Sequence, residues 1–262
     1  MSKEHAWPQW MGRGVEVGPT QTTWSVRYGR TAENELTEYP NVVSKKQGSV
    51  LTTRIREVCQ NCNNGWMSQL ENSVKPLLER LWQPNYVFGR TAIGVDDAAV
   101  LAAWAAKTAW IRERASQGRV TPTAEMRRRL MDTQMPPGFT RVWIARHTGR
   151  ANFDANVCRL QTTHQDDSWD TERRRNILVC TLTFRGLSIL VRTDDDWGVP
   201  EMHPPEDQWR RFWPTARAVQ WPTARPVTDG DVQDVAMWHD WVRHPDVPIF
   251  NRAPEHTATT RH

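Results

Sequence analysis

The sequence predicts an α+β fold, in which an N-terminal ββα-metal unit precedes helices and a small antiparallel sheet with a closing C-terminal helix. A β-prone stretch runs into a Cys-x-x-Cys at Cys59 and Cys62, and apolar residues at helical spacing follow it. Residues 97–132 carry two helical patterns, whereas residues 141–193 carry β-prone segments separated by turn residues. A last helical pattern covers residues 229–242.

The chain is long enough for one or two domains with a full hydrophobic core. It has 262 residues, of which 38% are hydrophobic, and its 15 tryptophans supply much of the apolar surface available for burial. We expect an N-terminal domain at residues 1–83, an α+β accessory domain at residues 84–250 and a disordered tail at residues 251–262.

The charge balance is mildly basic. Lys and Arg total 34 against 30 Asp and Glu, a formal charge of +4, and most of the basic residues are arginine. The planar fork of arginine suits phosphate, so this composition is compatible with a nucleic-acid partner without demanding one. A GC-rich genome explains the arginine excess equally well.

Cysteine content and hydropathy predict the cellular compartment of the protein. Four cysteines exclude a dense disulfide framework, and the polar N-terminus lacks the apolar segment of a signal peptide. The longest apolar run, Ala98–Ile111, is too short to span a bilayer. We therefore expect a cytoplasmic protein with no membrane partner, in which a Cys-x-x-Cys more often binds metal or does redox chemistry.

The sequence of residues 1–58 predicts strands and turns. Residues 1–11 form a strand or loop that enters the metal site, and Thr22–Tyr28 is β-prone. Asn41–Ser44 and Ser49–Val58 predict a hairpin around the turn Lys45–Gly48, and its second strand leads straight into Cys59.

Helical spacing begins after the Cys-x-x-Cys. Pro76 should kink or restart this helix, because it has no N–H to donate. Asp96 and Asp97 should cap a helix from Ala98 to about Arg114, and Thr123–Met131 is a further helix. The apolar positions of the first helix are Trp66, Leu70, Val74, Leu77, Leu78 and Leu81.

The second half predicts a sheet. Arg141–Arg146 and Val157–Thr162 are single strands, and Ile177–Phe184 pairs with Leu187–Arg192 in a hairpin about Arg185-Gly186. A Trp- and Pro-rich stretch follows, with a short tandem copy at Trp213–Arg217 and Trp221–Arg225 that should dock its tryptophans on the fold. The closing helix is expected from Asp229 to Val242.

A Cys-x-x-Cys supplies two thiolates on one tight turn, which is half of a tetrahedral zinc site. Cys158 and Cys180 lie in predicted strands and are not obvious partners. A redox role is less favoured, because redox Cys-x-x-Cys motifs sit in a βαβ setting and this one follows two strands and precedes a helix.

Two stretches together resemble the HNH endonuclease superfamily. They are Glu4-His5 followed by Trp7-Pro8-x-Trp10, and Cys59-x-x-Cys62-Asn63-Asn64-Gly65-Trp66-Met67-Ser68. The order is similar to the branch of phage recombination endonuclease VII, in which Asn directly follows the second cysteine. The resemblance implies a treble-clef-like ββα-metal unit and DNA as the partner.

The resemblance also implies roles for particular residues. His5 would be the general base that deprotonates the attacking water, a task suited to its near-neutral titration. Glu4 and Asn63 would hold a catalytic Mg²⁺, or another divalent ion, through oxygen ligands. Cys59 and Cys62 would bind a structural Zn²⁺ away from the cut phosphate. The family carries a second Cys-x-x-Cys before its Glu-His pair, so we expect either that it is encoded upstream of Met1 or that this member has lost half of its zinc site.

The chain departs from the family pattern at one further position. The middle Asn of the HNH name belongs on the strand before the Cys-x-x-Cys, where this chain has Thr52, Thr53 and Arg54. Asn41 is a distant candidate, and without a nearer Asn we expect His5 to be poorly oriented.

Plainer interpretations stand beside these roles. His5 can be a solvated histidine, Asn63 and Asn64 can cap the helix that follows, and the tryptophans are core residues rather than platforms for bases. Arg127–Arg129 and Arg173–Arg175 are solvated faces unless they share the catalytic face. Asp194–Asp196 reads as a polar turn, and no other histidine has a spacing typical of a metal site.

The sequence thus favours a metal-dependent HNH-type endonuclease that hydrolyses DNA phosphodiester bonds. The alternative is a non-catalytic zinc-knuckle module that binds nucleic acid or protein. A third possibility is a structural protein whose Cys-x-x-Cys only fixes the first helix.

Overall fold

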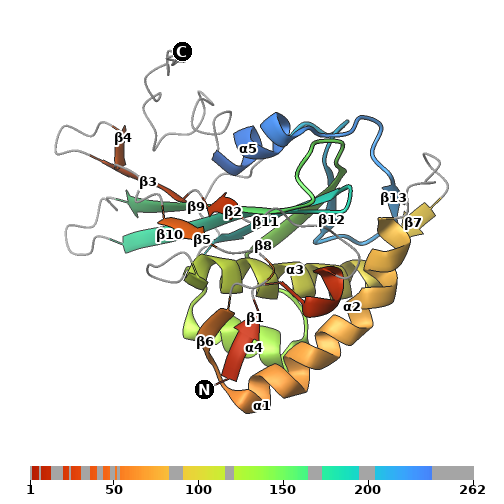
Figure 1. The fold of residues 1–262 in the computed structure, drawn as a ribbon, viewed down its shortest axis with the longest axis horizontal. Helices are drawn as coiled ribbons and strands as arrows, with labels where there is room; N and C mark the ends of the chain where they lie inside the picture. The colour runs from red at the N-terminus through yellow and green to blue at the C-terminus, as the bar shows by residue number, and fades with distance from the viewer. Residues whose placement is uncertain are drawn as a thin grey trace.

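The computed structural model has a mixed α+β fold with helices on both sides of a sheet (Figure 1). Helix α3 crosses one face of the sheet, with α2, α4 and the two strands β1 (Ser2–His5) and β6 (Arg54–Val58) beyond it, and α5 covers the opposite face. The residues that the structure describes are 2–5, 7–12, 20–23, 25–30, 36–39, 44–47, 51, 54–82, 91–115, 121–164, 173–194 and 204–237.

The central sheet has the strand order β12-β8-β11-β10-β9-β3-β4. Neighbouring strands are antiparallel except β3 and β9, which are parallel. The strands, in that order, are Arg210–Trp213, Thr140–Arg146, Leu187–Asp194, Arg173–Phe184, Phe153–His164, Ser25–Arg30 and Leu36–Tyr39.

The four predicted strands of the second half are confirmed, and all four are longer than the sequence indicated. The hairpin turns at Arg185 and Gly186, which both have positive φ (45° and 80°), the geometry that a two-residue hairpin turn needs. A polar turn was expected at Asp194–Asp196, and this prediction is wrong for Asp194, which belongs to a strand. Asp194 ends β11 with 1% of its surface exposed and accepts a hydrogen bond from Arg192 Nε at 2.9 Å.

The middle strands are buried on both faces, which explains their continuous apolar runs. One face packs on α3, where Leu178, Leu182 and Ile189 join the core around Trp104. Polar side chains on the middle strands bond to one another, and Thr183 Oγ1 lies 2.8 Å from Ser188 Oγ.

Helix α3 spans Val95–Ala115, and α4 spans Ala124–Thr133. Thr123, expected as the first residue of this helix, instead caps it by accepting a hydrogen bond from the Met126 N–H. The predicted capping role of Asp96 and Asp97 is wrong. The two carboxylates lie inside the first turn of α3, where the helix dipole favours negative charge, and the Ala98 N–H donates to the Gly94 carbonyl instead.

The predicted N-terminal hairpin is also wrong. Strand β5, Ser44–Gln47, occupies the expected turn and pairs with β2, Thr20–Thr23. Strand β6, Arg54–Val58, pairs instead with β1, Ser2–His5, in an antiparallel ribbon. A β-prone segment does not encode its partner, so the pairing of distant strands was not readable from the sequence.

Three helical pieces follow β6. They are α1 at Gln60–Cys62, a π-helical turn at Asn63–Met67 and α2 at Ser68–Leu81. The break lies at Gly65, whose ψ of −114° is non-helical, and not at Pro76, which sits inside α2 without ending it. The apolar positions predicted for this helix face the core, except Trp66, which is half-buried.

The C-terminal part closes the fold. Strand β13, Val219–Trp221, pairs with β7, Thr91–Ile93, and Trp221 is buried in the core. Helix α5, Asp229–Met237, begins where predicted, while residues 238–242 and the tail at 251–262 lie outside the described residues. Within the described residues, no helix has the length and apolar character needed to cross a membrane.

One core joins the N-terminal and C-terminal parts. Trp7 is fully buried and packs edge-on against Phe153 and Phe184 of the sheet, with ring centroids 5.7 and 5.5 Å away. Trp10 packs against Trp82 at 5.8 Å. Trp7 is thus a core residue, and the aromatic pairs fasten the segment that follows His5 onto the body of the protein.

Candidate functional site

The Cys-x-x-Cys forms a knuckle at the junction of β6 and α1. The Cys62 N–H donates to Cys59 Sγ at 3.0 Å, and the Asn63 N–H donates to the Cys59 carbonyl at 3.0 Å. Cys59 is exposed, and Cys62 packs beside Met67 and Ile111. Both thiols are free.

The two thiols differ in acidity because one donates to the other. The hydrogen bond from Cys62 stabilises the Cys59 thiolate and lowers the pKa of Cys59. The same bond, with partial burial, raises the pKa of Cys62. The first proton is therefore lost from the exposed sulfur, and the thiolate is the form that binds metal.

His5 is held by two hydrogen bonds. Its Nδ1 lies 3.3 Å from the Leu51 carbonyl oxygen, and its Nε2 lies 2.8 Å from Gln9 Nε2. A carbonyl only accepts, so Nδ1 carries the proton, and Nε2 accepts from the Gln9 amide. The Leu51 carbonyl therefore orients the ring, the task for which the sequence offered no Asn.

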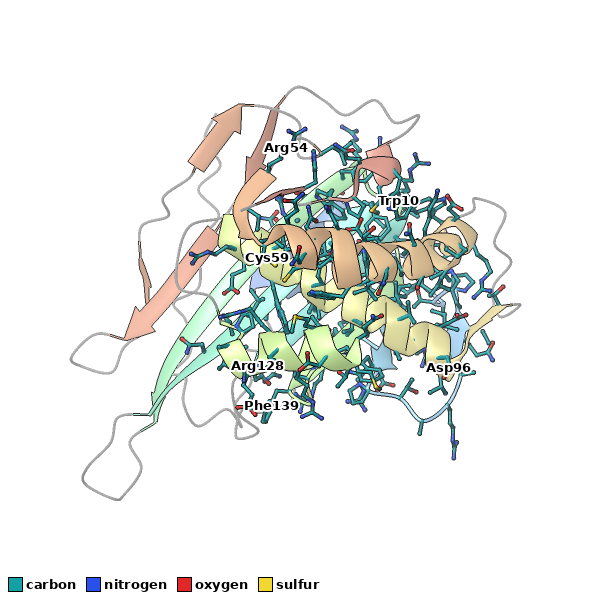
Figure 2. The ribbon with its side chains drawn as sticks, turned by 90° about the horizontal axis from the view of Figure 1, so that it is seen from below. Trp10, Arg54, Cys59, Asp96, Arg128 and Phe139 are labelled. Carbon is teal, nitrogen blue, oxygen red and sulfur yellow. The ribbon has the colours of Figure 1, made fainter. Side chains whose placement is uncertain are left out.

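The β1–β6 ribbon sets His5 and the knuckle at opposite ends. His5 pairs with Arg54, Glu4 pairs with Ile55, and Ser2 pairs with Val58, the residue before Cys59. Arg54 and Cys59 are labelled in Figure 2. At about 3.3 Å per residue, the five residue steps from Arg54 to Cys59 separate His5 and the knuckle by roughly 17 Å along the strand.

The chain after the knuckle folds back over the ribbon. Ile55 and Val58 of β6 pack against Met67 and against Ile111 of α3. Asn63 lies one turn before Met67 in the segment that folds back. The side chain of Glu4 lies outside the described residues, so the expected Glu4–Asn63 metal pair is not tested. Among the described side chains, no three His, Cys, Asp or Glu residues gather as a metal site.

A second polar cluster was not predicted. His147 Nε2 lies 2.9 Å from Asp229 Oδ1, and the Asp229 carboxylate also accepts the Arg150 N–H at 2.8 Å and the Ala151 N–H at 3.2 Å. Partial burial acts to raise the pKa of Asp229, but these hydrogen bonds and the neighbouring His147 outweigh it and lower that pKa. The cluster joins the end of β8 to the start of α5.

The cluster left little signal in the sequence, because His147 and Asp229 are far apart in the chain and have no metal-ligand spacing. The one local feature that fits this cluster is a glycine at position 149. A Cβ on this residue would lie within 2.5 Å of both Asp229 Cγ and His147 Nε2. Asp154 lies near this cluster, and burial raises the pKa of its carboxyl.

Comparisons of this chain with family models, curated proteins and solved structures found no match.

Proposed function

We propose that the protein is a metal-dependent endonuclease of the HNH type that hydrolyses DNA phosphodiester bonds. The observation that carries the proposal is the pairing of β1 with β6. It sets the Glu4-His5 strand beside the strand that ends at the Cys59-Cys62 knuckle, and Met67 of the helical segment after the knuckle packs against Ile55 and Val58 of that second strand. This order of strand, strand, knuckle and helix is the one that a ββα-metal unit requires.

His5 has the protonation that a general base needs. Because Nδ1 donates to the Leu51 carbonyl, Nε2 carries the lone pair, which accepts a hydrogen bond from the Gln9 amide in this structure. A water that takes the place of the Gln9 amide would lose a proton to Nε2 as its oxygen attacks phosphorus. The Leu51 carbonyl then stabilises the imidazolium that forms.

The knuckle fits a zinc ion as two of its ligands. Its exposed, acidified Cys59 sulfur and the N–H···S bond from Cys62 are suited to thiolate coordination. Its place at the far end of the ribbon from His5 suits a structural metal. Glu4 and Asn63 would hold a divalent ion, which when bound supplies positive charge to the phosphate.

Nicking of a supercoiled plasmid in the presence of Mg²⁺ tests the proposal. We expect wild-type protein to nick and His5→Ala to lose about 10²-fold or more in rate, the usual contribution of a general base. Glu4→Gln and Asn63→Ala should also lose activity. The matched controls Glu79→Gln and Asn72→Ala, at exposed positions of α2, should nick at the wild-type rate. Equal nicking by wild type and His5→Ala would refute the proposal.

One observation favours the alternative of a non-catalytic zinc-knuckle module. Both ring nitrogens of His5 already form hydrogen bonds with other groups of the chain. These bonds are also what a structural histidine that links β1 to Leu51 and Gln9 would make. On that alternative, His5→Ala lowers the melting temperature, and zinc-loaded wild type binds DNA or protein without nicking.

A further inference from the structure

Arg54 is the residue directly across the ribbon from His5. The register shift of this strand pair lies between Ser2 and Glu4, so the His5–Arg54 pairing is regular. Side chains directly opposite in an antiparallel pair lie on the same face, with Cβ atoms about 4.5–5.5 Å apart. The side chains of Arg54 and His5 therefore leave the ribbon on the same face, within reach of one another.

The face that carries Arg54 is the outer face of the ribbon. Ile55, the next residue of β6, packs inward on Met67 and Ile111, and successive side chains of a strand point to opposite sides. Arg54 is accordingly exposed (Figure 2). Ligands reaching His5 from solvent would meet the Arg54 side chain at the same edge.

Three other cations on the helical side form ion pairs within the fold. Lys107 pairs with Glu71 at 2.6 Å, Arg80 pairs with Asp97 at 2.7 Å, and Lys75 lies 3.9 Å from Glu79. Among the described side chains, Arg54 has neither an ion pair nor a hydrogen bond. Its charge and its five N–H donors are thus available to a ligand.

We propose that Arg54 is the phosphate-binding residue of the His5 site, and that it seats a backbone phosphate of the nucleic acid next to the Nε2 atom of His5. The proposal rests on the proposed function for the identity of the substrate. An arginine suits this position because its fork can donate two parallel hydrogen bonds to one phosphate, and because its charge opposes the negative charge that develops as water attacks. His5 and Arg54 would divide the work between proton removal and phosphate positioning.

Binding measured without catalysis tests this role first. In the His5→Ala background of the zinc-loaded protein, without added Mg²⁺, anisotropy of a labelled DNA duplex gives the affinity at several salt concentrations. We expect Arg54→Ala to weaken binding by about tenfold and to reduce the slope of log affinity against log salt by about one. Arg54→Lys should keep the slope. The control Arg217→Ala, at an exposed arginine between β12 and β13, should keep both affinity and slope.

Plasmid nicking then separates the two proposals. With His5 intact, Arg54→Ala and Arg54→Lys should both lower kcat, because lysine retains the charge but not the fork. If wild type does not nick but Arg54→Ala still loses one phosphate contact from the salt slope, the nuclease proposal fails and the Arg54 contact stands. If wild type nicks and Arg54→Ala matches Arg217→Ala in binding and nicking, the Arg54 proposal is overturned.

Discussion

The His147 imidazole and the Asp229 carboxylate meet at 2.9 Å and fasten the end of β8 to the first turn of α5. His147 is buried, and about half of the Asp229 side chain is exposed, at 48%. Because the same carboxylate accepts the Arg150 and Ala151 N–H groups, one side chain holds a loop, a strand end and a helix together.

This cluster predicts a pH-dependent contribution to stability. The hydrogen bonds favour the ionised carboxylate, so Asp229 has a folded pKa below that of an unfolded aspartate, about 3.9. Its stabilisation is therefore complete above that unfolded value and is lost as pH falls through the lower folded pKa. Asp229→Ala should cost about 1–2 kcal/mol at neutral pH, a range kept low because the carboxylate is half exposed.

Urea unfolding at several pH values checks this prediction. The difference in unfolding free energy between wild type and Asp229→Ala should be constant near neutrality and should shrink in acid. A difference that grows as pH falls would contradict it. Asp234→Ala, an exposed change on the same helix, is the control.

Gly149 should be needed for the approach of these two side chains. Gly149→Ala places a methyl group against Asp229 and His147, and we expect a loss of about 1–3 kcal/mol from overpacking. The loss should be smaller in the Asp229→Ala background, which a double-mutant cycle measures. Gly230→Ala is the control, since its nearest atom, Thr228 Oγ1, would be 3.7 Å from the new Cβ.

The Lys107–Glu71 pair should stabilise the contact of α3 with α2. The Nζ–Oε1 distance is 2.6 Å, and only 3% of the Lys107 side chain is exposed. Glu71→Ala removes the partner of a buried charge and should cost about 3 kcal/mol, whereas Lys107→Met with Glu71→Leu should recover most of that loss.

The exposed Lys75–Glu79 pair is the comparison for this prediction. Its atoms are 3.9 Å apart with side chains 40% and 49% exposed, so Glu79→Ala should cost less than about 0.5 kcal/mol. Denaturant unfolding of wild type, Glu71→Ala, Glu79→Ala and the Lys107→Met, Glu71→Leu double variant measures these free-energy differences. Equal costs for Glu71→Ala and Glu79→Ala would contradict it.

The geometry of the knuckle predicts an order in which the four cysteine thiols react. Cys59 is exposed and has the lower pKa, so iodoacetamide should modify it before Cys62, while Cys158 and Cys180 react only after unfolding. Zinc should protect Cys59 and Cys62 together, and a chelator should restore their reactivity. Mass spectrometry of modified peptides reads the order, and zinc that leaves Cys59 reactive would count against metal binding at the knuckle.

The local patterns of the sequence determined much of the fold. The alternation and turn residues of residues 141–193 gave the strands and the Arg185-Gly186 hairpin, because these depend on near neighbours in the chain. The apolar spacing of α2 predicted its buried positions for the same reason. The Cys59–Cys62 spacing likewise predicted a tight turn, which the Cys62 N–H···S bond closes.

Only the tertiary structure decided which distant segments meet. Residues 49–58 looked like half of a local hairpin, but β6 pairs with β1, because a β pattern sets the face of a strand and not its partner. The same holds for His147 with Asp229, which no spacing relates. It holds for Arg54 too: the sequence placed it in a stretch without the expected Asn, and the strand register set it opposite His5.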